Sequence, residues 1–205
     1  MPRYRRPRAG ELPTDTIALA RALIGWVLVR ELPEGRASGR IVETEAYVLD
    51  DPASHAYRGR SARNASMFLA AHRAYIYKIY GTSWCVNVTS ERAGEGAAVL
   101  LRALEPLEGL ALMENRRGSS RTRDLCRGPG RLCRALAIDK ELDGINLLRD
   151  RRLWLVGPLG EPARQVHAGR RIGITRAAQR ALRFHEAGSP FVSGPGHCFP
   201  KRAML

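Results

Sequence analysis

Residues 40–87 read RIVETEAYVLDDPASHAYRGRSARNASMFLAAHRAYIYKIYGTSWCVN, and the strand-like runs near the two ends of this stretch decide the fold. The first run, Ile41–Val48, alternates in character along its length. With a strand period of two, Glu43, Glu45 and Tyr47 share one face. Two carboxylates and a tyrosine make a poor core face, so this face is expected either to be solvated or to line a cleft.

The second run, AYIYKIY at Ala74–Tyr80, carries three tyrosines. Tyr75 and Tyr77 share a face, and Tyr77 is expected to point inward. Tyr80 falls on the opposite side, one residue before the turn-forming Gly81, and is expected to project from the strand end. The two runs together predict a pocket for a flat ring, with tyrosine walls and a carboxylate at its floor.

The composition points to one core and an anionic partner. A chain of 205 residues with no long linker is expected to form a single domain. Its 34 Lys and Arg against 20 Asp and Glu leave a formal charge of +14. This balance predicts binding to nucleic acid, since cationic side chains displace the counterions of phosphates. The alternative is a ribosome-associated or simply arginine-rich protein from a GC-rich genome.

The cysteines predict no metal site. Only Cys126 and Cys133 are close in sequence, and the six residues between them match no common zinc spacing. The chain shows no signal-like segment and no long apolar run, so it is expected to be soluble and intracellular, with reduced thiols. No membrane association and no cofactor are expected.

The flanking sequence predicts short elements. An N-terminal helix is capped by Thr14 or Asp15, and its buried stripe begins at Ile17. The polar loop at residues 50–63 is too long for a simple connector and is expected to be functional. The other predicted elements are strands at Trp26–Leu32, Trp84–Thr89, Ala97–Leu104, Arg171–Thr175 and Ala181–His185, a helix from Glu105 to Arg116, a short helix capped by Asn64, and a helix starting near Pro129.

Arg102 stands inside an apolar strand and therefore requires a carboxylate or phosphate partner. Residues 150–170 are predicted to be a loop, and the chain after Gly188 is predicted to lose order. Strands and helices mix without strict βαβ alternation. The predicted fold is therefore a single α+β domain over residues 1–205 with a mostly antiparallel sheet, flexible at residues 1–11 and about 194–205.

A carboxylate facing a tyrosine-walled slot on a basic protein suggests chemistry on a nucleobase. Such an enzyme must flip the nucleotide out of duplex DNA, at a cost on the order of a few kcal/mol. Stacking on aromatic rings returns roughly 1–3 kcal/mol per base. Alkylated purines carry positive charge, which aromatic faces favour by roughly 0.5–2 kcal/mol. The parts required are an intercalating plug, an aromatic sandwich, a general base and phosphate contacts.

Several segments closely resemble the alkyladenine (3-methyladenine, methylpurine) DNA glycosylase family. They are GRIVETEAYV, DDPASHAYRG, RNASMF, YIYKIYG, WCVNV, AAVLLRALEPLEGL, LCRGPGRLCRALAI and GSPFVS. They occur in order from about Ala18 to Ser193. The resemblance implies a curved antiparallel sheet with flanking helices, related to the C-terminal domain of methionyl-tRNA formyltransferase. It also implies a monomer that acts on duplex DNA containing damaged purines.

The resemblance implies a role for each of three residues in hydrolysis. Glu45 would be the general base that activates water for attack on C1′. Arg102 and the carbonyl of Ile174 would hold that water. Spacing alone cannot choose between Glu43 and Glu45, and the resemblance selects Glu45. Family members are monofunctional: they release a free base and leave the backbone uncut.

The resemblance also assigns the base pocket. Tyr47 and Tyr77 would sandwich the flipped base, with His55 on an edge of the pocket. Asn87 would crowd the exocyclic amine of normal guanine and so reject it. Tyr80 would be the intercalating plug. In isolation, His55 would more often be a surface or capping histidine, and Asn87 a residue that satisfies backbone groups.

Cations near these motifs are expected to bind the DNA backbone: Lys78, Arg123, Arg127 and Arg131. The alternative for the arginine-rich segment is a solvated loop. The sequence departs from the family pattern at Leu69–Arg73 and at Thr82-Ser83, which affects fine substrate preference rather than reaction class.

Two other classes of protein would account for part of this sequence. A glycoside hydrolase could use Glu43 and Glu45 as its carboxylate pair, but the charge and the lack of sugar-binding tryptophans oppose it. A non-catalytic protein that binds damaged DNA would not need a carboxylate on the base-facing wall.

Overall fold

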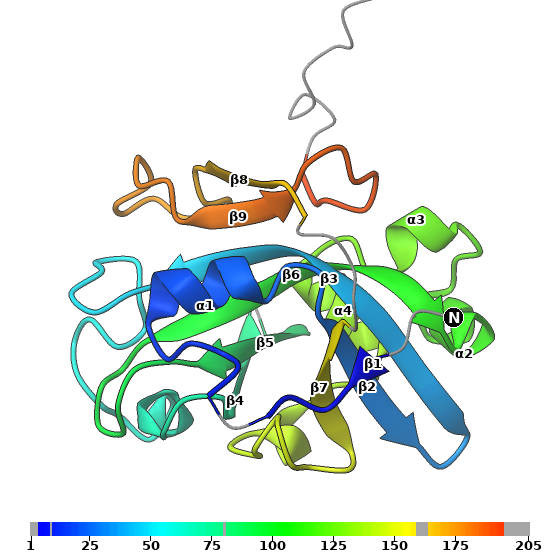
Figure 1. Cartoon of the computed structure of the whole chain (residues 1–205), viewed down its shortest axis with the longest axis horizontal. Helices are drawn as coiled ribbons and strands as arrows, with labels where there is room; N and C mark the ends of the chain where they lie inside the picture. The colour runs from blue at the N-terminus through cyan, green and yellow to red at the C-terminus, as the bar shows by residue number, and fades with distance from the viewer. Residues whose placement is uncertain (1–3, 9, 80, 159–163, 195–205) are drawn as a thin grey trace, which may run out of the picture.

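The computed structural model describes residues 4–8, 10–79, 81–158 and 164–194, which form one nine-stranded sheet with helices packed against it (Figure 1). Every strand pairing within it is antiparallel. The predicted α+β class is therefore confirmed. The strands are β1 (Tyr4–Arg5), β2 (Val27–Leu32), β3 (Gly35–Tyr47), β4 (Ala74–Ile79), β5 (Ser83–Thr89), β6 (Ala98–Glu108), β7 (Leu153–Pro158), β8 (Val166–Gly169) and β9 (Arg183–Glu186). The helices are α1 (Thr16–Ala22), α2 (Leu110–Arg117), α3 (Thr122–Leu125) and α4 (Pro129–Ala135), with 3-10 turns η1 (Ala65–Phe68) and η2 (Lys140–Leu142).

Strand β3 is the centre of the sheet. The path runs β1-β7-β2-β3-β6-β5-β4, and β9 adds to β3 with β8 beyond it. The first half of β3 lies between β2 and β6, and its second half lies between β9 and β6. The β3–β6 register shifts around Glu43. Glu43 and Glu45 therefore lie where β3 is flanked on both sides, and both are fully buried rather than solvated.

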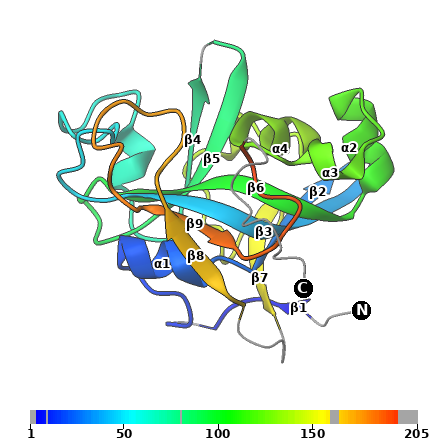
Figure 2. The same ribbon diagram turned by 90° about the horizontal axis from the view of Figure 1, so that it is seen from above.

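Strands β4 and β5 form the predicted hairpin, which projects from the body of the molecule (Figure 2). Tyr75 pairs with Asn87, and Tyr77 pairs with Cys85. Alternation thus points Tyr75 and Tyr77 to the same side, as predicted. Tyr80 lies outside the described residues, so its role as a plug stays a prediction.

Helix α1 packs against the centre of the sheet. Asp15 caps it by accepting a hydrogen bond from the Ala18 amide at 2.7 Å. The Thr44 hydroxyl on β3 donates to the Ala20 carbonyl at 2.8 Å. Ile17, expected in the buried stripe, is 40% exposed, because the helix turns Leu19 and Ala20 to the sheet instead. The cysteines that the structure describes, Cys85, Cys126 and Cys133, are free and buried.

The predicted helix from Glu105 is wrong at its start. Strand β6 continues to Glu108, and Pro106 lies opposite Gly39 beside a register shift, where a missing amide is tolerated. Gly109, with φ of +76°, then turns the chain into α2. Tertiary pairing with β3 therefore overrides the helix-start pattern.

The predicted strand at Arg171–Thr175 is also wrong. Gly173 has φ of +79°, which a strand cannot hold, and the Ile172 amide donates to Glu45 instead of to a neighbouring strand. The strand predicted at residues 181–185 is present as β9, shifted to Arg183–Glu186. The expected loop at residues 150–170 contains β7 and β8, which gain their strand conformation from pairing with distant strands.

Both ends are more ordered than expected within the described residues. Strand β1 pairs with β7, and Arg5 forms an ion pair with Glu11 at 2.6 Å. After Gly188, Val192 and Ser193 are buried against the sheet. Predicted flexibility at residues 195–205 falls outside the description. No helix in the described part of the chain has the length and apolar character needed to span a membrane.

Candidate active site

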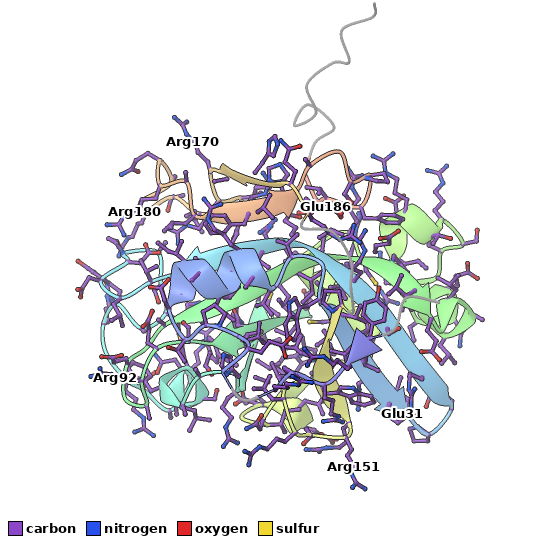
Figure 3. All side chains as sticks on the ribbon, viewed as in Figure 1. Glu31, Arg92, Arg151, Arg170, Arg180 and Glu186 are labelled. Atoms are coloured by element: carbon purple, nitrogen blue, oxygen red, sulfur yellow. The ribbon has the colours of Figure 1, made fainter. Side chains whose placement is uncertain are left out.

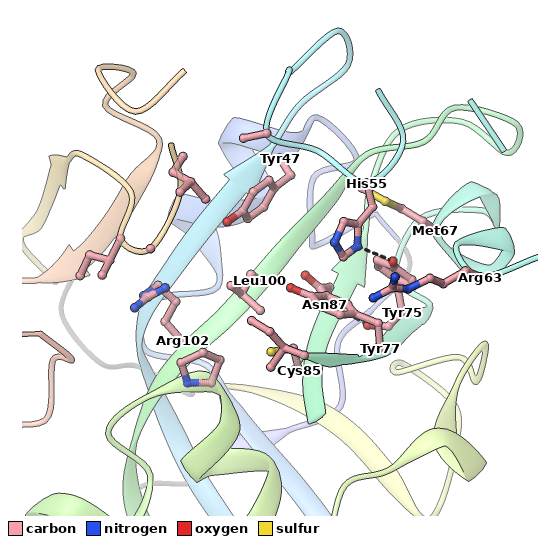
Figure 4. Close-up of a pocket in the computed structure, with 16 residues that line it drawn as sticks. Tyr47, His55, Arg63, Met67, Tyr75, Tyr77, Cys85, Asn87, Leu100 and Arg102 are labelled. Carbon is pink, nitrogen blue, oxygen red and sulfur yellow. Dashed lines mark hydrogen bonds between the residues drawn. The ribbon is translucent and has the colours of Figure 1, made fainter. Parts of the chain in front are cut away.

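A pocket of about 530 Å³ opens between the end of β3 and the β4–β5 hairpin (Figure 4). Its aromatic lining comes from both sides of the opening. Tyr47 stands on the β3 side, and His55 lies with Tyr75 and Tyr77 on the hairpin side. Arg102 on β6 lies deeper in the pocket. The predicted ring-binding slot with tyrosine walls is therefore a real cavity.

The aromatic wall is held by ring contacts and one hydrogen bond. His55 Nδ1 lies 2.8 Å from the Tyr75 hydroxyl, and the His55 and Tyr77 rings meet edge to face at 4.4 Å between centroids. Burial raises the pKa of the phenols of Tyr47, Tyr75 and Tyr77, which keeps them neutral. Burial, and then the charge of Arg63, lower the pKa of His55 and favour its uncharged form. The wall is apolar in character and uncharged.

Glu45 has no exposed surface and does not itself line the pocket, but its three partners, Tyr47, Arg102 and Ile172, all do. Its Oε1 accepts from the Ile172 amide at 2.7 Å and lies 3.2 Å from Nη1 of Arg102. Its Oε2 accepts from the Tyr47 hydroxyl at 3.0 Å. Burial raises the pKa of this carboxyl, and Arg102, the Ile172 amide and the Tyr47 hydroxyl oppose that rise. The balance leaves the pKa of Glu45 raised, and a carboxylate of raised pKa is a stronger proton acceptor.

Glu43, two residues earlier, has a different surrounding. Its Oε1 receives Nε of Arg183 at 2.5 Å and Nε of Arg102 at 3.3 Å. Its Oε2 accepts from the Ser193 amide at 2.7 Å. Two of these three donors lie away from the pocket, whereas every donor to Glu45 comes from a residue that lines it. Glu43 is bound to β9, to Ser193 and to Arg102, whereas Glu45 is bound only to residues that line the cavity.

The pocket brings together most of the site residues expected from the sequence: Arg102, Tyr47, His55, Tyr77, Asn87 and Ile174 all line it. Asn87 is 3% exposed, and its Nδ2 donates to the Tyr75 carbonyl at 2.9 Å, which fixes the amide. The partner required by Arg102 is a carboxylate, as predicted, and it has two. The individual roles of these residues stay predictions.

The cations expected at the DNA backbone differ in their freedom. Nε of Arg123 donates to the Pro190 carbonyl at 2.9 Å. Nε of Arg127 donates to the Val192 carbonyl at 2.8 Å. Arg131 is half exposed and lies only 3.8 Å from Asp124. Lys78 is exposed, with its ammonium 5.3 Å from the centre of the Trp84 ring.

Several residues at the site were not singled out from the sequence. Arg63 and Met67 line the pocket beside Tyr75. Asp51 and Arg171 form a buried ion pair next to Tyr47. No local pattern marks such residues, because their partners are far away in the sequence. The length and polarity of the loop at residues 50–63 are the only sequence signal near Asp51, and no sequence feature marks Arg171 as part of a site.

The fold and the pocket together define a class. A buried carboxylate is bound by residues that line an aromatic pocket, on a strongly cationic chain, and this arrangement fits a hydrolase that acts on a flat ring carried by a polyanion.

Comparison with known proteins specifies that class further. The model of the methylpurine-DNA glycosylase family matches residues 11–190. A protein of Mesorhizobium japonicum, provisionally named a 3-methyladenine DNA glycosylase, is 56% identical over 90% of this chain and 88% of its own length. The human DNA-3-methyladenine glycosylase is 47% identical over 86% of this chain and 64% of its own length. The chain belongs to the methylpurine-DNA glycosylase family, a family of DNA-repair hydrolases.

Proposed function

We propose that this chain removes alkylated or deaminated purines from duplex DNA as a monofunctional glycosylase and so starts base excision repair. The substrates proposed are 3-methyladenine, 7-methylguanine, hypoxanthine and ethenoadenine. Since a stacked base is unreachable, the damaged nucleotide is flipped into the pocket. The chain acts as a monomer inside the cell, at the DNA.

The aromatic wall seats the flipped base. Tyr47 and Tyr77 sandwich the ring, and His55 contacts its edge. A neutral, π-rich wall favours a cationic alkylated purine and still accepts a neutral one such as hypoxanthine. The amide of Asn87 crowds the exocyclic amine of normal guanine, and its fixed orientation supports this role. Tyr80 fills the space that the base leaves in the duplex.

The position of Glu45 carries the proposal. Its Oε2 accepts one hydrogen bond from Tyr47, and a carboxylate oxygen has room for a second donor. A water held there by Arg102 and the Ile174 carbonyl loses its proton to Glu45 as its oxygen attacks C1′. The N-glycosidic bond breaks, and the bonding electrons leave with the base. The products are a free purine and an abasic site in an uncut backbone.

An alkali-cleavage assay on duplexes with one hypoxanthine or ethenoadenine tests this function. The wild type is expected to give strand breaks only after hot alkali, because the abasic site is alkali-labile. Glu45→Gln is expected to lose about 10²–10⁴-fold in rate, the usual contribution of a general base, while binding the same duplex. The exposed Glu141→Gln serves as the matched control and should remain active. Full activity of Glu45→Gln would contradict the proposal.

A further inference from the structure

Asp51 and Arg171 form an ion pair with no exposed side-chain surface, between residues 120 positions apart. Nη2 of Arg171 lies 3.0 Å from Oδ1 of Asp51, and Nη1 contacts the other carboxylate oxygen. Nη1 also donates to the Ala46 carbonyl at 3.0 Å, between Glu45 and Tyr47. A two-pronged contact of this kind fixes both the distance and the orientation of the guanidinium.

The pair fixes the segment that follows Arg171. Residues 171–180 form neither helix nor strand, so no backbone ladder sets their position. The next residue, Ile172, points its amide at Oε1 of Glu45 from 2.7 Å. Because Arg171 is tied to β3 through the Ala46 carbonyl, the amide of the next residue, Ile172, is held at the carboxylate of Glu45, the residue before Ala46.

The pair also supports Tyr47. The Arg171 guanidinium carbon lies 4.7 Å from the centre of the Tyr47 ring, which places a planar cation against one ring face. The hydroxyl of the same tyrosine donates to Oε2 of Glu45. Asp51 balances the charge and accepts from the Ala53 amide at 3.1 Å, at the start of the loop that carries His55.

We propose that Asp51 and Arg171 are positioning residues that hold two donors, the Ile172 amide and the Tyr47 hydroxyl, on the carboxylate of Glu45. They touch neither the base nor the water. This inference rests on the proposed role of Glu45 as the general base. Its alternative is a pair that only stabilises the fold.

Loss of either donor shifts the pKa of Glu45 in a defined direction. Hydrogen bonds to the ionised form of a carboxyl lower its pKa, so losing them raises the pKa of Glu45. More of the base is then protonated at low pH, and the acid limb of the rate profile moves to higher pH. Substitution of Asp51 or Arg171 leaves the other titratable and charged residues around Glu45 unchanged: Glu43 on β3, Arg102 on β6, Arg183 on β9 and Cys85 on β5.

Single-turnover rates of excision between about pH 5 and pH 9 test the inference in the full chain. Arg171→Lys and Asp51→Glu both keep the charges of the pair but remove the two-pronged contact in its native geometry. Both are expected to move the acid limb to higher pH and to lose at least about tenfold in rate at the acid end. The loss should shrink at the alkaline end.

Arg40→Lys is the matched control. Arg40 is also a buried arginine anchored on β3, paired with Glu105 and Glu186, but it does not contact Glu45 or its donors. It should lower thermal stability without moving the acid limb. Lower stability with an unmoved limb in Asp51→Glu and Arg171→Lys would overturn the inference, and if Arg171→Lys fails to fold, Asp51→Glu decides alone. If Glu45→Gln keeps the acid limb of the wild type, the proposed function fails instead.

Discussion

Glu43 and Glu45 illustrate how two identical side chains on one strand come to differ. Both have no exposed surface and both contact Arg102. Glu43 is enclosed by Arg183 and Ser193, on the side away from the cavity. Glu45 receives its donors from residues of the pocket, and its Oε2 accepts one hydrogen bond, from Tyr47. Chemistry at this site therefore depends on neighbours contributed by distant segments, and not on spacing within β3.

The Tyr47 hydroxyl gives a test at one atom. Tyr47→Phe keeps the ring but removes the donor to Glu45, so the pKa of Glu45 should rise and the acid limb of excision should move to higher pH. We expect a loss of about tenfold or more at the acid end, from the loss of a hydrogen bond to a charged group worth about 1.5–3 kcal/mol. Tyr77→Phe is the control, since its hydroxyl makes no contact with Glu45, and an equal shift there would contradict the explanation.

Asn87 gives a test of selectivity. Its amide is fixed by the Tyr75 carbonyl at 2.9 Å, inside the pocket. Asn87→Ser removes the bulk proposed to reject guanine, so release of undamaged guanine relative to hypoxanthine should rise about 10–200-fold, the range for small changes in pocket shape. Release is measured by chromatography of free bases after incubation with plain and hypoxanthine-containing duplexes. An unchanged ratio would remove Asn87 from the selectivity mechanism.

At the scale of elements, Gly109 decides where β6 ends and α2 begins. A Cβ added there would overlap the Arg36 carbonyl oxygen and lie 2.9 Å from Cα of Ala37, in a backbone of φ +76°. Gly118, at the other end of α2, has φ +63° but open space around it. Gly118→Ala should therefore cost only the left-handed backbone penalty of about 1–2 kcal/mol in unfolding free energy.

Gly109→Ala should cost clearly more than Gly118→Ala, because the clash is with backbone that cannot rotate away. Urea unfolding of the two variants, followed by circular dichroism, gives the comparison. Equal losses of unfolding free energy in the two variants would mean that the contact between β3 and α2 adjusts to the added methyl group. Gly109 would then be required only for its positive φ angle.

The elements also show how far a local pattern reaches. Alternation over Ile41–Val48 and Ala74–Tyr80 predicted β3 and β4 correctly, since period-two runs bounded by turns have few competing structures. The Glu105-Pro106 start signal failed because β3 extends the strand to Glu108 through pairing remote in sequence. The strand predicted at Arg171–Thr175 is absent for a related reason: the Ile172 amide donates to Glu45 rather than to a neighbouring strand.

For the pocket too, part of the arrangement follows from local sequence patterns and part depends on the folded chain. Tyr75 and Tyr77 on one face, and Glu45 with Tyr47 on another, follow from strand period alone, and resemblance supplied their proposed roles. That the two faces meet in one cavity depends on β5 and β6 lying between β4 and β3. The Asp51–Arg171 pair could not be predicted, because only the folded chain brings residues 120 positions apart into contact.

Over the whole molecule, the charge of +14 is spread around the surface rather than confined to one loop. Arg92, Arg151, Arg170 and Arg180 project outward from different sides (Figure 3). Several other arginines are bound to the chain itself, as Arg127 is to the carbonyls of Val192 and Gly194. Net charge therefore overstates the number of cations that are free to meet phosphates, and each has to be judged by its own contacts.

Salt dependence of duplex binding separates the two kinds of arginine. Each phosphate neutralised steepens the plot of log K against log salt by about 0.9, so losing one contact should flatten the slope by about 1. Arg131 is half exposed, and to reach DNA it has to give up only an exposed ion pair with Asp124 at 3.8 Å, a kind of contact that contributes little to stability. Arg131→Ala should therefore flatten the slope while the fold keeps its stability. Arg127→Ala should instead lower the stability of the fold and leave the slope unchanged, since the donors of Arg127 already hold residues 192–194 against the sheet. A flatter slope in Arg127→Ala with unchanged stability would contradict this expectation. It would mean that Arg127 exchanges its carbonyl partners for a phosphate when DNA binds. The segment that ends at Gly194 would then have to move on DNA binding.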